Sequence, residues 1–160
     1  KKLDDDEINV RVNNALAIAS KEVLDKFKNR WAMIDNYIDD EKYSIVSGLL
    51  KDSNIVVGSS DYVILSNKLQ SIVDRMNCNL FTIEDLLEKV FDNRVYVAII
   101  SDEKWNIVKN KYINDIKSGK KYTLIKNENN NKVDGSVVKE KNDSIDQLID
   151  LVGNNIIEYK

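Results

Sequence analysis

Two short apolar runs, separated by four small or polar residues, place the strongest constraint on how this chain can fold. The runs are Ile55-Val56-Val57 and Tyr62-Val63-Ile64-Leu65, and the residues between them are Gly58-Ser59-Ser60-Asp61. β-Branched and aromatic residues favour strands, and a short polar connection containing glycine favours a turn. The pattern therefore predicts a β-hairpin. Its turn carries one carboxylate as its only strongly reactive group, so the hairpin suggests a scaffold and not a catalytic site.

A third β-forming run follows later in the chain. Residues 94–100 read RVYVAII and are followed by Ser101-Asp102-Glu103. An oxygen-bearing side chain followed by two acids is typical of a helix N-terminus. The sequence therefore predicts a strand that leads directly into a helix ending near Gly119. Apolar side chains recur on that helix at Trp105, Val108, Tyr112 and Ile116.

Helical spacing of apolar residues marks the segments around these strands. Between residues 8 and 40 apolar side chains recur every three or four positions. This stripe predicts either one long helix or a pair of helices with Ser20 as the cap of the second. A shorter helix is expected from Asp39 to Leu50. Residues 69–91 are expected to form two helices that meet at Asn77-Cys78-Asn79.

The order of these elements predicts an α+β fold. We expect a small three-stranded sheet covered by helices on one face, with a long N-terminal helix or helix pair. This wiring is related to that of KH domains, which bind single-stranded nucleic acid through a GxxG loop. No two of the five glycines are three residues apart, so that loop is absent from the sequence. The wiring is therefore related to that of KH domains, but the loop with which those domains hold nucleic acid is missing.

Composition divides the chain into parts of different character. It begins with Lys1-Lys2 and not with Met, which suggests a piece of a longer protein. The polar, aperiodic stretch before residue 144 predicts a mobile surface loop. The expected parts are a linker remnant (residues 1–7), a core domain (8–116), a mobile loop (117–143), and a C-terminal helix and tail (144–160).

The residue types that are missing argue against an enzyme. The chain has no histidine, so a Ser-His or Cys-His nucleophile cannot form within it. Its glycines form neither a dinucleotide fingerprint nor a phosphate loop. Adjacent carboxylates occur at Asp4-Asp5-Asp6, Asp39-Asp40-Glu41 and Glu84-Asp85. Neighbours in a helix point to different sides, so these acidic runs do not predict a metal site. No catalytic residue, cofactor or metal is expected.

Charge and cysteine content indicate the compartment and the class of partner. The formal net charge is −3, which argues against holding nucleic acid through bulk positive charge. No apolar run approaches the roughly 18 residues that span a bilayer. The single cysteine, Cys78, cannot form an internal disulfide, which suits a reducing cytosol. We therefore expect a cytoplasmic protein with no membrane association; the charge balance disfavours direct nucleic-acid binding, although folding could still gather a local basic patch.

Four stretches share their order and spacing with one protein family: residues 11–31, 47–68, 95–113 and 148–160. They resemble the C-terminal region of the tau subunit of bacterial DNA polymerase III, in the form found in low-GC Gram-positive bacteria. The likeness is a hydrophobic skeleton with recurring words such as LLKDS, and it contains no catalytic fingerprint. It covers most of the chain and is weakest over residues 117–143.

The resemblance implies a non-catalytic adaptor with a variant KH-like fold. In that family the N-terminal part of tau is the ATP-driven clamp-loader motor. The C-terminal part is a separate module that holds the alpha polymerase subunit, and a neighbouring region contacts the replicative helicase. The implied function is to tether the alpha subunit to the clamp loader within the polymerase III holoenzyme. Two alternatives stay open: a helicase-contacting module and a single-stranded DNA-binding KH-like domain.

Two groups of residues are candidates for the contact with a partner. The closing segment is apolar, and it docks either on its own core or on the polymerase, as a helix in a groove or an added strand. Its candidate contact residues are Ile145, Leu148, Leu151, Val152, Ile156, Ile157 and Tyr159. Trp105 and Tyr112 form the second group, because aromatic anchors dominate interface energies. Ordinary core packing is the alternative for these two rings.

Overall fold

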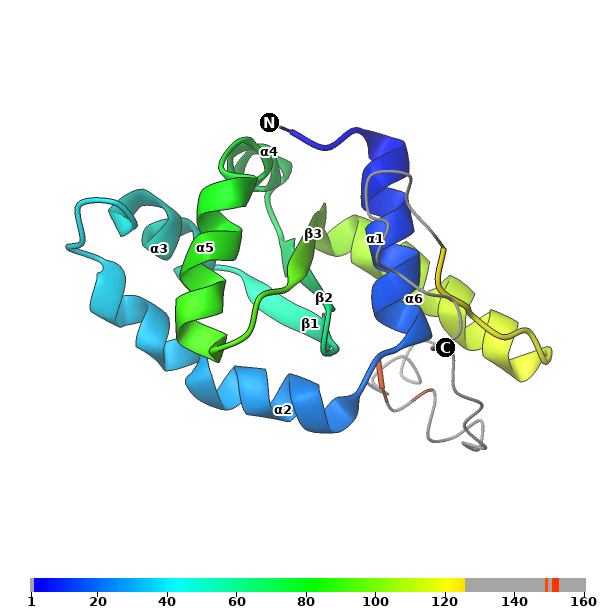
Figure 1. Cartoon of the computed structure of the whole chain (residues 1–160). Coiled ribbons are helices and arrows are strands. Elements are labelled where there is room, and N and C mark those ends of the chain that lie inside the picture. Colours follow the sequence, from blue (N-terminus) through cyan, green and yellow to red (C-terminus); the bar gives the residue numbers. More distant parts are fainter. Residues whose placement is uncertain (1, 126–148, 150, 153–160) are drawn as a thin grey trace.

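A three-stranded sheet lies between two layers of helices in the computed structural model, which describes residues 2–125, 149, 151 and 152 (Figure 1). β1 (Asn54–Gly58) and β2 (Tyr62–Asn67) pair antiparallel, so the predicted hairpin is confirmed. β3 (Tyr96–Ser101) lies on the other side of β2 and runs parallel to it. Within the described residues, the chain is therefore an α+β protein with a small mixed sheet.

The larger helical layer covers what we call the first face of the sheet. α4 (Gln70–Cys78) and α5 (Leu80–Phe91) connect β2 to β3 across this face. The same layer contains α2 (Lys21–Arg30), the 3₁₀ helix η1 (Trp31–Tyr37) and α3 (Ser44–Lys51). One hydrophobic cluster joins these helices to five side chains of the sheet: Ile55, Val63, Leu65, Val97 and Ile99.

The second face of the sheet is covered by α1 (Asp5–Ala17) and α6 (Asp102–Lys117), as Figure 1 shows. The expectation that helices lie on one face only is therefore wrong. All six residues of β2 are buried, and its side chains alternate between the two faces. A strand of this kind needs an apolar layer on each side. The sheet residues in the second cluster are Val57, Tyr62, Ile64, Ala98 and Ile100.

The N-terminal helical stripe is interrupted at Ser20. α1 ends at Ala17, and the Ser20 hydroxyl accepts a hydrogen bond from the Val23 amide at the start of α2. The acidic stretch assigned to a linker is also folded. The Asp4 carboxylate accepts from the Glu7 amide at 2.8 Å, and the Glu7 carboxylate accepts from the Asp4 amide at 2.9 Å. This reciprocal capping box begins α1.

Single residues also set where several other helices begin or end. The Ser101 hydroxyl accepts a hydrogen bond from the Lys104 amide and caps α6, as predicted. α4 and α5 meet at Asn79, so the predicted joint is confirmed. Gly119 follows α6 with a φ of 91°, a conformation that favours glycine. α3 begins at Ser44, later than Asp39, after a turn in which Asp40 accepts two backbone hydrogen bonds.

The predicted mobile loop is described only as far as Ile125. Tyr122 and Leu124 pack against the hydrophobic cluster of the second face. Asn13 on α1 donates a hydrogen bond to the Thr123 carbonyl at 2.8 Å. Residues 118–125 are thus held to the folded core. The remainder of the predicted loop, residues 126–143, lies outside the described residues.

α2 approaches β1 closely at Gly58. The Ser20 amide donates a hydrogen bond to the Gly58 carbonyl at 2.9 Å. A Cβ atom at Gly58 would lie 2.9 Å from Cα of Leu24, a distance shorter than van der Waals contact. Glycine is required here because the backbone of α2 occupies the space of a side chain.

Gly58→Ala should lower the free energy of unfolding by about 1–3 kcal/mol, because the added methyl group must displace the backbone of α2. Urea denaturation followed by circular dichroism measures this change. Gly48→Ala on α3 is the matched control, since its Cβ would have no atom within 4 Å. Alanine favours a helix interior by about 0.5–1 kcal/mol, so the control should be neutral or stabilising. Equal effects at both positions would contradict the close approach.

Candidate partner-binding surfaces

The two aromatic candidates on α6 lie in the core. Trp105 is 6% exposed and Tyr112 is 1% exposed, and both belong to the cluster on the second face. The Tyr112 ring packs edge-on against Tyr122, with 5.0 Å between ring centroids. These rings are buried against the chain itself, so they offer no anchor to a partner while the fold is intact. Both rings therefore take part in core packing, the alternative that the sequence left open for them.

Three residues of the closing segment are described, and they lie on the second face. Val152 is buried there, and Ile149 and Leu151 are half-buried against the same cluster. The Val152 amide donates a hydrogen bond to the Ile149 carbonyl at 3.1 Å. This part of the segment therefore docks on its own core, one of the two alternatives left open by the sequence. The other candidates lie outside the described residues: Ile145, Leu148, Ile156, Ile157 and Tyr159.

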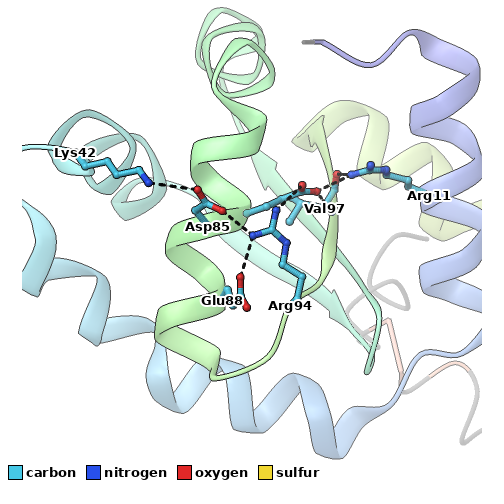
Figure 2. Close-up of polar contacts among 7 residues, drawn as sticks. Arg11, Lys42, Asp85, Glu88, Arg94 and Val97 are labelled. Carbon is cyan, nitrogen blue, oxygen red and sulfur yellow. Dashed lines mark hydrogen bonds and ion pairs between the residues drawn. The ribbon is translucent and has the colours of Figure 1, made fainter. Parts of the chain in front are cut away.

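A clamp of two charged side chains closes the outer edge of β3 (Figure 2). The Glu84 carboxylate on α5 accepts hydrogen bonds from the Val97 amide at 2.9 Å and from the Arg11 guanidinium at 2.7 Å. Arg11 on α1 also donates to the Val97 carbonyl at 3.0 Å. Both backbone groups of Val97 are thereby satisfied at an edge where another strand would otherwise pair.

A second and more exposed group of charges surrounds Arg94, just before β3 (Figure 2). Its guanidinium donates to Asp85 at 2.7 Å and to Glu88 at 3.0 Å, and lies 3.8 Å from the Glu84 carboxylate. Lys42 lies 3.6 Å from Asp85. The side chains of Arg94 and Glu88 are 38% and 51% exposed. Solvent screens such pairs, so each contributes little to stability and remains accessible to a partner.

Phe81 lies beside these charges. It is 65% exposed at the start of α5, and the guanidinium carbon of Arg94 lies 5.4 Å from the centroid of its ring. A guanidinium over an aromatic face is a favourable contact. Phenylalanine and arginine are both enriched at the cores of protein interfaces. We call the group formed by Lys42, Phe81, Asp85, Glu88 and Arg94 the α5 surface.

Within the α5 surface, the ion pair between Asp85 and Arg94 favours the charged forms of both side chains. The hydrogen bond from Arg94 holds the pKa of Asp85 below its ordinary value, while partial burial opposes this shift. The same hydrogen bond raises the pKa of Arg94. Both groups therefore stay ionised at neutral pH. Their arrangement suits binding through fixed charges and not proton transfer.

The acidic runs and the single thiol have ordinary structural surroundings. In the part of the chain that the structure describes, no group of three or more His, Cys, Asp or Glu side chains could hold a metal ion. Cys78 is exposed at the end of α4. None of the described helices has the length and apolarity needed to cross a membrane.

Comparison of the chain with models of protein families, with curated proteins and with solved structures finds no match. The likeness to the tau C-terminal region therefore rests on the stretches of sequence given above. The clamp at Val97 was not predicted from sequence, because Arg11 and Glu84 are 73 positions apart and no local pattern relates them. The sequence contains one weak indication that Phe81 is exposed, since this residue falls outside the apolar stripe of α5.

Glu84→Ala should lower the free energy of unfolding by about 2–4 kcal/mol, because it leaves the Val97 amide and the Arg11 guanidinium without their buried acceptor. Glu88→Ala removes an exposed carboxylate from the same helix and should cost less than about 1 kcal/mol. Urea denaturation of both variants measures the difference. Equal, small losses would show that the clamp at Val97 does not hold the fold.

Asp85→Asn should reduce stability at pH 7 and have a shrinking effect in acid. A carboxyl group whose folded pKa is depressed stabilises the protein above its unfolded pKa of about 3.9. That contribution is lost as the pH falls through the lower, folded value. Urea denaturation of the wild type and of the variant between pH 7 and pH 3 tests this. A stability difference that stays constant from pH 7 to pH 3 would contradict it.

Proposed function

We propose that this chain is a non-catalytic adaptor module of a bacterial DNA polymerase III holoenzyme, which tethers the alpha polymerase subunit to the clamp loader. The resemblance of most of the sequence to the tau C-terminal region supports this assignment. The absence of histidine from the sequence supports a binding role over catalysis. Tethering works through effective concentration, because a linked polymerase stays available at a roughly millimolar level even when one contact lets go.

The observation that carries a binding role is Phe81. The opposite side of α5 is wholly buried, with Leu86 and Leu87 at 0% exposure, which fixes the helix on the first face. Phe81 on the same helix is 65% exposed, with Arg94 against its ring. Leaving a large ring in water is unfavourable, and it becomes useful when a partner covers it. We therefore propose the α5 surface as a contact for the alpha subunit.

The variant KH-like fold belongs to the same proposal. The observed order supports it, with a hairpin, two helices and a third strand parallel to the middle strand. Glu84 and Arg11 occupy the edge of β3, and the sequence has no GxxG loop. These features favour protein recognition over the binding of single-stranded nucleic acid.

Calorimetric titration of the full chain with the alpha subunit from the same organism tests this function. Phe81→Ser should weaken binding by about tenfold or more, as expected for an aromatic anchor. Ile107→Ser on α6 is the matched control, since Ile107 is 63% exposed on the opposite side of the sheet, and it should not change the affinity. Both variants should unfold at the wild-type temperature, because neither side chain is buried.

The alternatives give distinguishable outcomes. Binding that survives Phe81→Ser but is lost in Ile156→Ser/Ile157→Ser would keep the adaptor function and move its contact to the closing segment. A folded wild-type chain that does not bind the alpha subunit would contradict the polymerase tether. Titrations with the replicative helicase and with single-stranded DNA then separate the two remaining functions, since DNA binding weakens steeply with salt.

A further inference from the structure

Residues 120–125, which we call the strap, lie on α1 and α6 in the manner of a bound peptide. The Ile125 amide donates to Oδ1 of Asn14 at 2.7 Å, and Nδ2 of Asn14 donates to the Ile125 carbonyl at 3.1 Å. Nδ2 of Asn13 donates to the Thr123 carbonyl at 2.8 Å. Two neighbouring side-chain amides thus bind the backbone of an extended segment, as a neighbouring strand would.

Side chains of the strap fill sites on the same surface. The Tyr122 ring packs edge-on against Tyr112, and its hydroxyl donates to the Asp115 carboxylate at 2.7 Å. Leu124 packs against the hydrophobic cluster of the second face. The surface therefore contacts the side chains of Tyr122 and Leu124. It binds the residues after each of them, Thr123 and Ile125, through their backbone.

The residues that bind the strap are also held by the rest of the fold. Asn14 is 0% exposed, and its Oδ1 accepts a further hydrogen bond from Asn13 at 3.1 Å. Its Nδ2 donates to the Tyr62 hydroxyl at 3.2 Å. Asp115 lies 2.9 Å from Lys111, one turn earlier on α6. Removal of the strap would leave both ends of the Asn14 amide with a partner, so the surface stays ordered for another ligand.

We propose that this surface of α1 and α6 is a peptide-binding site, occupied in cis by the strap, that accepts from a partner protein an extended segment with the pattern Tyr-x-Leu-x. The strap shows which chemistry the surface accepts, because the side chains of Tyr122 and Leu124 pack on it, while Thr123 and Ile125 are bound through their backbone. A partner segment binds after the strap leaves, and the linked strap competes with it at a high effective concentration. The site lies on the face opposite the α5 surface, so its occupation does not depend on the proposed polymerase contact.

Fluorescence anisotropy with a labelled peptide of residues 120–125 (KKYTLI) tests the site without any polymerase. The peptide is titrated with the full wild-type chain and with the full chain carrying Tyr122→Ala/Leu124→Ala, which weakens the strap but leaves its site intact. The strap variant should bind the peptide about tenfold more tightly than the wild type does, because the competing segment is weakened. A peptide with Tyr replaced by Ala should bind neither protein.

Substitutions of Asn13 and Asn14 test whether the peptide binds at the surface that holds the strap. Adding Asn14→Leu to the strap variant should abolish peptide binding, and adding the milder Asn13→Ala should weaken it several-fold. Asn13 is only half-buried, so that variant keeps the fold even where Asn14→Leu does not. Failure of a folded strap variant to bind the peptide would overturn the proposal. So would binding that is unchanged by Asn13→Ala.

Hydrogen exchange of the wild-type chain gives an independent measurement. The Ile125 amide should exchange faster than the amides of β2, because the strap must leave its site while the sheet stays folded. Exchange of Ile125 at the rate of β2 would mean that the strap opens only on global unfolding. That result would overturn binding of a partner segment in trans.

Discussion

The clamp of Arg11 and Glu84 on Val97 is the contact on which the two helical layers depend. α1 covers the second face and α5 the first, and the two side chains meet at the outer edge of β3 (Figure 2). A three-stranded sheet is too small to hide its edges with further strands, so side chains must satisfy the exposed backbone. The Glu84 side chain is 9% exposed, and its charge is offset by a guanidinium and an amide in one place.

The same clamp fixes the position of α1 and, through it, the strap. Arg11 and Asn14 are three positions apart on α1 and lie on one side of the helix. The Arg11 guanidinium lies 5.1 Å from the Tyr96 ring, and the Tyr96 and Tyr62 rings are 5.4 Å apart. Tyr62 in turn accepts a hydrogen bond from Asn14. A row of contacts therefore runs across the second face from the edge of β3 to the residue that binds the strap.

Local chemistry in the sequence predicted the elements, and non-local contacts decided how they assemble. The hairpin, β3 and the Ser101 cap each follow from a few neighbouring residues. The second helical layer also had a signal in the sequence, since β2 is apolar without the alternation of a half-exposed strand. Trp105 lies on the apolar stripe of its helix, and such a position favours the core over an interface. No pattern indicates that Arg11 meets Glu84, because the chain must fold before those side chains approach.

The proposed adaptor role would require that partner binding leave the core unchanged, and the arrangement of charges around Arg94 is compatible with that requirement. Its short contacts are with Asp85 and Glu88, while Glu84 lies 3.8 Å away. A partner that engages Arg94 therefore disturbs exposed pairs of low energetic weight and leaves the hydrogen bonds of Glu84 to Arg11 and Val97 in place. The buried clamp supports the fold, and the exposed group beside it remains available for recognition. The proposed strap site lies on the opposite face, so a partner segment bound there would not contact the α5 surface.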